Sequence, residues 1–90
     1  MLEASVLVSN RLGLHARAAA KLVSLAKSFD ASITVSDQTG TRMADAASIL
    51  DILALAASFG TRLTITAEGT EEADAIEAVT RLFHDKFGED

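Results

Sequence analysis

His15 is the residue of this sequence best suited to group-transfer chemistry, and the segment 10–17 around it reads Asn-Arg-Leu-Gly-Leu-His-Ala-Arg. Imidazole titrates near neutral pH, and its neutral form is a nucleophile. A helix starting at His15 would place the free backbone N–H groups of Ala16 and Arg17 where an anion can bind. The guanidinium of Arg17 can also bind phosphate oxygens in a bidentate manner. These features suit a histidine that is itself phosphorylated.

The charges around His15 differ from those of the whole chain. The 90 residues include 8 Lys and Arg against 13 Asp and Glu, which gives a net charge of −5. This acidic balance argues against a nucleic-acid-binding module, which needs a basic face. Between positions 11 and 29, however, the charged residues are all basic: Arg11, Arg17, Lys21 and Lys27. This local positive segment favours an anionic group at His15.

Other interpretations of His15 remain open at this level. A lone histidine at a helix start is more often a surface or capping residue. Metal binding is disfavoured, because the only other histidine, His84, has no supporting ligand pattern and the chain has no cysteine. No nearby Ser, Asp or Glu completes a nucleophile–base pair. The alternatives to a phosphorylated histidine are therefore a non-phosphorylated regulatory or ligand-binding module and, less favoured, an autonomous enzyme.

The elements that must position His15 follow from hydrophobic periodicity. Apolar and polar residues alternate in segments 2–9, 31–36 and 62–67, which is the period of a half-buried strand. A turn at 37–40 should lead into a short returning strand at 41–44. The second faces of these strands are mostly Ser, Thr or charged. This pattern predicts a sheet with one covered face and one exposed face.

Three further segments have helical spacing. The first spans 16–29, with an apolar stripe of Ala19, Leu22, Val23 and Ala26. The second spans 48–59 and is followed by Gly60, a favoured residue after a helix end. Thr70 is expected to cap the third, whose first turn is acidic. Its expected buried stripe is Ile76, Val79 and Phe83.

The element order predicts an α+β fold, with the helices on one face of an antiparallel sheet. Its first six elements match a ferredoxin-like split βαβ arrangement, which hosts several unrelated functions. The length and the absence of Pro and of low-complexity tracts predict a single domain over residues 1–90. No apolar run approaches the roughly 20 residues needed to cross a bilayer. The absence of cysteine fits a reducing compartment, so we expect a soluble cytoplasmic protein that contacts no membrane.

Gly13-Leu14-His15-Ala16-Arg17 resembles the phosphorylation-site motif of HPr, the histidine-containing phosphocarrier family of the phosphoenolpyruvate-dependent phosphotransferase system. Segments 48–50, 60–65 and 68–75 resemble later landmarks of that family at matching spacing, so the resemblance covers almost the entire chain. It implies one HPr-like domain, an open-faced β-sandwich in which three helices cover one face of a four-stranded antiparallel sheet (βαββαβα).

The resemblance also implies the function. His15 would accept a phosphoryl group on Nδ1 from phosphorylated enzyme I and pass it to a histidine of an enzyme IIA-type protein, while Arg17 neutralises the phosphoryl oxygens. Such a carrier is not an enzyme with its own turnover and needs no cofactor or metal. It would serve sugar transport or nitrogen regulation. Ala18 stands where many relatives have Pro, which points to a specialised branch such as the nitrogen-related NPr proteins. A small carrier that docks several partners in turn is expected to be a monomer.

The segment 48–59 has more apolar residues than one buried stripe can accommodate, so part of it is expected to form an exposed partner surface. The alternative is a short helix buried on all sides. Nearby basic residues would steer an acidic partner to this surface. The expected surface consists of Lys21, Lys27, Ile49, Leu50 and Leu53.

Ser48 has two interpretations. It matches the position that a regulatory kinase phosphorylates in many relatives of the family, and such a kinase would be a further partner. Alternatively, Ser48 caps the following helix, and Asp51 completes a capping box. Asp51 stands where the family usually has Gly and would repel a phosphate. Ala47 stands where a basic residue is common. Both departures favour the capping role.

Overall fold

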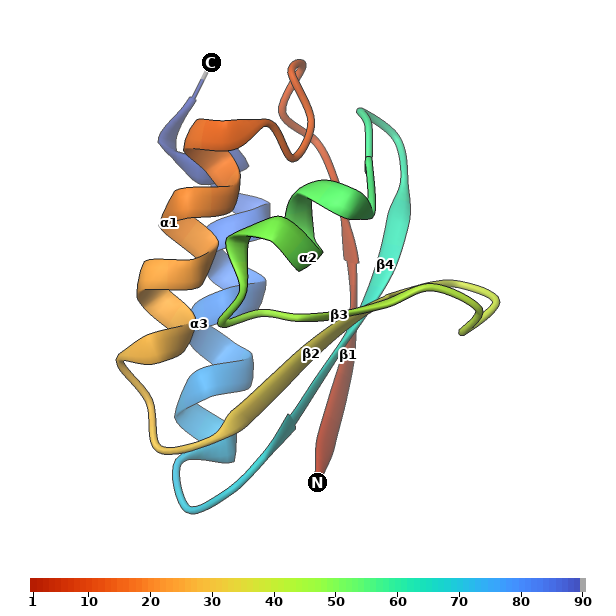
Figure 1. The fold of residues 1–90 in the computed structure, drawn as a ribbon. Coiled ribbons are helices and arrows are strands. Elements are labelled where there is room, and N and C mark those ends of the chain that lie inside the picture. The colour runs from red at the N-terminus through yellow and green to blue at the C-terminus, as the bar shows by residue number, and fades with distance from the viewer. Residues whose placement is uncertain (90) are drawn as a thin grey trace.

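The computed structural model describes residues 1–89. Its strands are β1 (Leu2–Leu7), β2 (Ser32–Asp37), β3 (Met43–Asp45) and β4 (Arg62–Glu68). Its helices are α1 (Ala16–Lys27), α2 (Ile49–Ala54) and α3 (Glu72–His84), and a short 3₁₀ turn, η1 (Lys86–Gly88), follows α3. The three helices cover one face of the four-stranded sheet (Figure 1). The expected βαββαβα fold is confirmed.

The sheet has the strand order β1-β4-β2-β3, and all neighbouring strands are antiparallel. Because β4 lies between β1 and β2, those two strands run parallel to each other and α1 connects them, as in a split βαβ unit. The register pairs Val6 with Leu63 and Val35 with Ile65. All four side chains are buried, so the alternation in the sequence marks the covered face of the sheet.

The core lies between this covered face and the helices. The stripe predicted for α1 is buried, together with Ala18. The stripe predicted for α3 is correct at Val79 and Phe83, whereas Ala75 is buried in its first turns and Ile76 is only half-buried. Phe87 of η1 extends this core, packing edge-to-face on Phe83 with 4.8 Å between the ring centroids.

The predicted end of the second helix is wrong. α2 stops at Ala54 rather than at residue 59, and Ala56 turns the chain with a left-handed φ of 51°. Gly60 instead belongs to the turn before β4, where its N–H donates to the carbonyl oxygen of Val8 at 2.8 Å. The carbonyl of Ala57 accepts the backbone N–H of Leu14 at 2.9 Å. If α2 continued to residue 59, this carbonyl would move into the helix and the hydrogen bond to Leu14 would be lost. The loop before α1 therefore competes with continuation of α2.

The cap predicted for the third helix is also wrong. The hydroxyl of Thr70 donates to the carboxylate of Asp30 at 2.6 Å, and Glu71 occupies the N-cap position without a side-chain cap hydrogen bond. Asp30 lies 40 positions earlier, between α1 and β2, and its charged carboxylate makes this a strong hydrogen bond that ties Thr70 to that loop. Other boundaries shift by one or two residues: among them, β1 ends at Leu7 instead of 9, α1 ends at Lys27 instead of 29, and β3 begins at Met43 instead of 41.

Candidate functional site

The loop that connects β1 to α1 fixes the position of His15. A hydrogen bond within the loop, from the N–H of Gly13 to the carbonyl of Asn10 at 3.1 Å, holds its backbone. Gly13 has a φ of +70°, and a Cβ there would lie 2.7 Å from the carbonyl oxygen of Ala57. Both the conformation and the close approach require glycine. This tight loop delivers His15 in an extended conformation to the first position before α1.

His15 is the N-cap residue of α1, as the sequence indicates. Its Nδ1 accepts a hydrogen bond from the backbone N–H of Arg17 at 3.3 Å, and its carbonyl accepts the N–H of Ala19 at 2.8 Å. The side chain is 24% exposed, so most of the ring is shielded from solvent and part of it is accessible. Nδ1 therefore faces the positive end of a helix of 12 residues.

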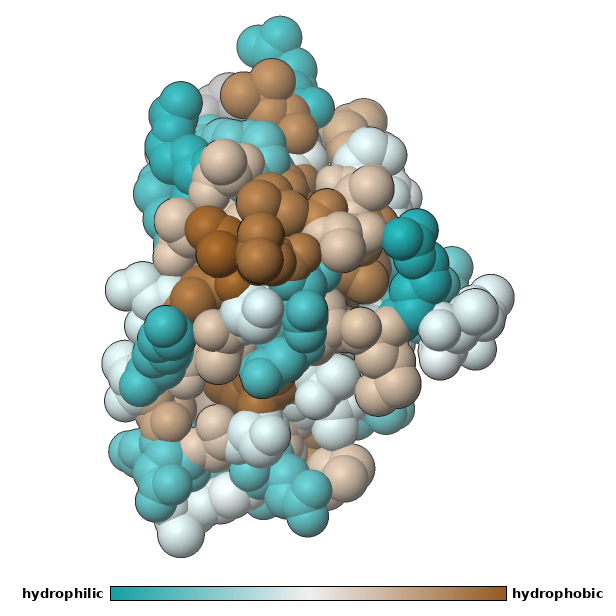
Figure 2. Space-filling view, in the orientation of Figure 1, coloured by the Kyte–Doolittle hydropathy of each residue, from teal (hydrophilic) through white to brown (hydrophobic). Residues whose placement is uncertain are grey.

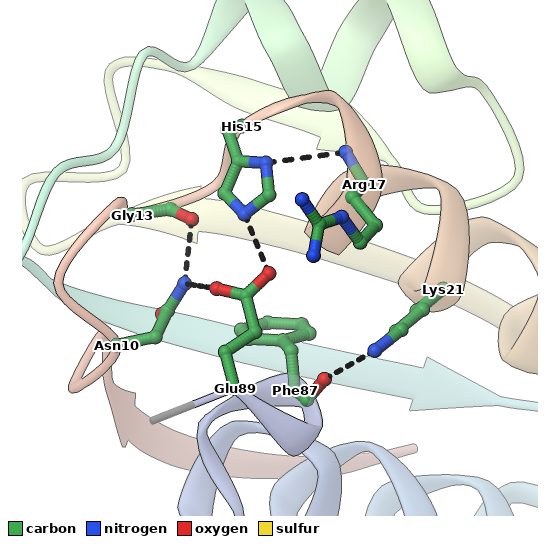
Figure 3. A network of polar contacts seen from close by, with 7 residues as sticks. All are labelled: Asn10, Gly13, His15, Arg17, Lys21, Phe87 and Glu89. Carbon is green, nitrogen blue, oxygen red and sulfur yellow. Dashed lines mark hydrogen bonds and ion pairs between the residues drawn. The ribbon is translucent and has the colours of Figure 1, made fainter.

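A carboxylate from the far end of the chain contacts the other ring nitrogen (Figure 3). Oε2 of Glu89 lies 2.6 Å from Nε2 of His15, and Oε1 of Glu89 accepts from Nδ2 of Asn10 at 3.0 Å. The same Nδ2 donates to the carbonyl of Gly13 at 2.7 Å. Asn10 is fully buried. One buried amide thus holds both the loop before His15 and the carboxylate beside it.

The surroundings of Glu89 favour its ionised form. The hydrogen bond from Asn10 is the main cause that holds the pKa of this carboxyl below its usual value. The hydrogen bond with His15 and the charges of His15 and Arg17 act in the same direction, while loss of solvent acts against them. Figure 3 shows the Arg17 guanidinium beside the ring and the carboxylate. The site therefore contains an ionised acid at neutral pH.

The segment 85–89 after α3, here called the hook, contains η1 and carries Glu89 to this position. The Nζ of Lys21 donates to the carbonyl oxygen of Phe87 at 2.6 Å, and the Phe87 ring is buried in the core. Phe87 has a φ of 57°, which is a left-handed conformation that costs an aromatic residue energy. Core packing of the ring and the lysine contact hold the hook in this conformation. Lys21, expected on the partner surface, is engaged here with the chain itself.

Sequence reasoning missed the roles of Glu89 and Asn10. Glu89 and His15 are 74 positions apart, and the helical periodicity ends with α3. The one signal was Phe87, an apolar residue beyond the helix, which indicates that the chain returns to the core. Nothing in the sequence marks which side chain that return brings to His15.

An exposed apolar face lies on α2. Ile49, Leu50 and Leu53 are 39%, 76% and 36% exposed, whereas Ile52 is fully buried. Figure 2 shows hydrophobic side chains gathered over α2, next to the start of α1. The expected exposure of this face is confirmed, and the alternative of a helix buried on all sides is wrong. Lys27 is also exposed, in the last turn of α1.

Ser48 is the N-cap of α2. Its hydroxyl oxygen accepts the backbone N–H of Asp51 at 3.3 Å. In a full capping box, the carboxylate of Asp51 would also accept the backbone N–H of Ser48. Here that carboxylate accepts the backbone N–H of Asp45 at 3.2 Å. The N–H of Ser48 donates instead to the Asp45 carbonyl at 2.9 Å. The capping role of Ser48 is confirmed, and the reciprocal half of the box is replaced by contacts to the end of β3.

Within residues 1–89, no group of three or more His, Cys, Asp or Glu side chains is arranged to hold a metal ion. Over the same residues, no helix is long and apolar enough to cross a membrane.

Comparison with known proteins identifies the family. The model of the family described as "PTS HPr component phosphorylation site" matches residues 2–85. The chain is 43% identical over 90 residues to "Phosphocarrier protein HPr" of Xylella fastidiosa, covering 100% of this chain and 99% of that protein. It is 43% identical over 88 residues to "Phosphocarrier protein NPr" of Shewanella violacea, covering 98% and 94%.

The fold comparison agrees with the sequence comparison. The crystal structure of HPr-C-His from Thermoanaerobacter tengcongensis matches with a TM-score of 0.94 at 38% identity, and the match covers 100% of this chain and 99% of that one. Together with the loop, helix start and histidine described above, these matches show that the chain belongs to the HPr family of phosphocarrier proteins of the phosphotransferase system.

Proposed function

We propose that His15 accepts the phosphoryl group of this carrier on Nδ1. The observation that supports this most directly is the 3.3 Å contact between Nδ1 and the backbone N–H of Arg17. A backbone N–H can only donate, so Nδ1 must offer its lone pair at that position. An unprotonated nitrogen at the positive end of a helix has what a nucleophile needs to receive an anionic group.

Apart from the bond that Nδ1 itself forms, the transfer requires mainly positioning and charge stabilisation from the protein. The Nδ1 lone pair forms the new bond to phosphorus, and the bond from phosphorus to the donor breaks, leaving its electron pair on the donor. The phosphoryl oxygens then lie beside the first-turn N–H groups of Ala16 and Arg17, which helix geometry leaves without an intrahelical acceptor. The guanidinium of Arg17 supplies the balancing positive charge.

Phosphorylated enzyme I is the proposed donor, and a histidine of an enzyme IIA-type protein is the proposed acceptor. The relatives are named phosphocarrier proteins, and a phosphocarrier moves phosphoryl groups between partners without being an enzyme itself. The HPr and NPr relatives are equally similar at 43% identity. These identities do not favour sugar transport over nitrogen regulation, so the specialised, nitrogen-related role that Ala18 indicates stays a prediction.

The exposed face of α2 is the proposed docking surface for both partners. Ile49, Leu50 and Leu53 supply its apolar centre, and Arg17 and Lys27 supply positive charge on the adjoining helix. An apolar centre with charges at its edge favours a partner patch that is apolar in the middle and acidic around it.

Three further expectations stay predictions. The cytoplasmic location is one. The monomeric state is another, and a relative of 38% identity with a TM-score of 0.77 is described as an "HPr dimer from Thermoanaerobacter tengcongensis". Regulatory phosphorylation of Ser48 is the third. Phosphorylation of the Ser48 hydroxyl would disrupt its cap hydrogen bond with the N–H of Asp51, and the phosphate would be repelled by the Asp51 carboxylate.

The test of the proposed function is intact-mass spectrometry after incubation with phosphoenolpyruvate and enzyme I. The wild-type protein should gain one phosphoryl group that is lost in acid and stable in base. His15→Ala should gain none. His84→Ala should behave as wild type, because it removes an exposed imidazole from α3 and leaves the site intact.

The opposite result is equally informative. A phosphoryl group retained by folded His15→Ala would place phosphorylation at another residue. No gain in the wild type with enzyme I of demonstrated activity would indicate a family member that binds partners without carrying a phosphoryl group.

A further inference from the structure

The two ring nitrogens of His15 face partners of opposite kinds. Nδ1 faces the backbone N–H of Arg17, which is only a donor, and Nε2 faces the carboxylate of Glu89, which is only an acceptor. In the neutral ring, both hydrogen bonds can form only if the proton is on Nε2 and Nδ1 is bare. This is the tautomer that transfer to Nδ1 requires.

Glu89 is placed with more constraint than a surface acid. Its side chain is 9% exposed, and both carboxylate oxygens are used, one by Nε2 of His15 at 2.6 Å and one by Nδ2 of Asn10 at 3.0 Å. Because Nδ2 of the buried Asn10 also donates to the Gly13 carbonyl, the amide cannot rotate without losing the loop contact. The carboxylate therefore has one favoured orientation.

The hook that carries Glu89 is fixed independently of His15. The buried ring of Phe87 anchors it in the core, and Lys21 holds the Phe87 carbonyl at 2.6 Å. The position of Glu89 is thus preorganised by packing and not created by its contact with the histidine.

We propose that Glu89 is a positioning residue for phosphoryl transfer at His15, through the hydrogen bond from Nε2–H to its carboxylate. This inference rests on the proposed function of His15. Glu89 orients the ring and fixes its tautomer, so that the Nδ1 lone pair is available to the incoming phosphorus. A carboxylate that orients a histidine is a recurring device at nucleophilic and metal sites.

The carboxylate also stabilises the charge that transfer produces. When the Nδ1 lone pair forms the bond to phosphorus, the broken bond leaves its electrons on the donor, and Nε2 keeps its proton. The ring consequently becomes positively charged, and the adjacent Glu89 carboxylate balances that charge without any proton transfer. The return step to an acceptor reverses these changes, so the same contact assists both directions.

The variant that tests this is Glu89→Gln. A carboxylate accepts at both oxygens, whereas an amide accepts at one, so glutamine must lose either the Asn10 or the His15 hydrogen bond. Asp85→Asn is the matched control. It removes the same charge from the same hook, and the Asp85 side chain makes no hydrogen bond or ion pair with any described residue.

Two readouts are needed. The first is the ¹⁵N NMR spectrum of the His15 ring at slightly alkaline pH without enzyme I, which distinguishes the protonated from the bare nitrogen. The wild type and Asp85→Asn should show one tautomer, protonated on Nε2, and Glu89→Gln should show a mixture. The second is the rate of phosphoryl uptake from enzyme I. Glu89→Gln should be slower by about tenfold and still reach one phosphoryl group.

The outcomes separate this inference from the proposed function. A Glu89→Gln protein with wild-type tautomer and wild-type rate would overturn the role of Glu89 and leave His15 as the carrier residue. An equal loss of rate in Asp85→Asn would assign the effect to charge in general and would also overturn the inference. Failure of the wild type to accept any phosphoryl group would overturn the proposed function, and with it any role of Glu89 in transfer.

Discussion

The electrostatic surroundings of His15 are those of an ion cluster and not of a purely basic segment. The sequence places four basic residues and no acid between positions 11 and 29. The fold adds Glu89, whose carboxylate lies on the ring and close to Arg17. The charge of Arg17 thus acts on an acid of the protein itself. In the proposed function, the ring becomes positively charged on phosphorylation and balances Glu89, so that Arg17 can turn to the phosphoryl oxygens.

The pH dependence at this residue has a definite sign. Because the pKa of Glu89 in the folded protein lies below its ordinary value of 4.5, the stability from its contacts is present above pH 4.5 and is lost as the pH falls through the folded pKa. Asn10→Ala removes the main cause of the shift. The Glu89 pKa should then rise toward its ordinary value, as measured by carboxyl ¹³C NMR titration.

Asp37 provides the control in the same spectrum. Loss of solvent raises its pKa, but hydrogen bonds within its own turn outweigh this and lower the pKa below the ordinary value. None of these contacts involves Asn10, so the Asp37 pKa should be the same in both proteins. An unchanged Glu89 pKa in Asn10→Ala would contradict the assigned cause.

At the scale of the element, the six-residue helix α2 has one side that packs in the core and one side that is exposed to solvent. Ile52 points into the core and is fully buried, whereas Leu50 is 76% exposed. Since the helix stops at Ala54, the chain that follows is free to contact the loop before α1. The same short helix thus supports the His15 loop from one side and presents an apolar surface beside it.

These two sides should respond differently to substitution. Ile52→Ala should lower the free energy of unfolding by about 2–5 kcal/mol, because it leaves a cavity in the core. Leu50→Ser should change it by less than about 0.5 kcal/mol. The same Leu50→Ser variant should raise the KM for phosphorylation by enzyme I several-fold with little change in kcat, because it weakens docking and leaves His15 in place.

Leu7→Ser is the control for the docking effect. Leu7 is 42% exposed on the opposite, uncovered face of the sheet, where its neighbour in the register is Arg62. Its KM should equal that of the wild type. Equal KM values for all three proteins would show that the face of α2 does not contact enzyme I.

At the scale of the whole molecule, the site is assembled from both ends of the chain. The loop before α1 supplies Asn10 and His15, and the hook after α3 supplies Glu89 (Figure 3). The buried contact of Phe87 with Phe83 joins that hook to the core. Stability of the domain and organisation of the site are therefore linked through one aromatic ring.

Phe87→Ala should affect both. The lost ring should lower the free energy of unfolding by about 3–5 kcal/mol in urea denaturation, which is a large fraction of the stability of a small domain. In the protein that remains folded, the ¹⁵N spectrum of His15 should show the tautomer mixture expected when Glu89 is released. Phe59→Ala, at a phenylalanine that is 63% exposed, should change neither measurement. A destabilised Phe87→Ala with an unchanged His15 spectrum would disprove the link.

The sequence by itself determined what depends on neighbouring residues. Alternation gave the covered faces of β1, β2 and β4, helical spacing gave the buried stripe of α1, and His15 was correctly placed at a helix start. These features depend on side chains within one or two turns, so their pattern is present in the sequence itself. The motif around His15 was sufficient to indicate the family.

Only the tertiary structure decided the remaining features. The end of α2 depends on a hydrogen bond to Leu14, and the role of Thr70 depends on Asp30, which lies 40 positions earlier in the chain. Glu89 reaches His15 over 74 positions because Phe87 is buried in a core that all the main elements build together. Such contacts have no local pattern, since their free energy depends on which surfaces the completed fold brings into contact.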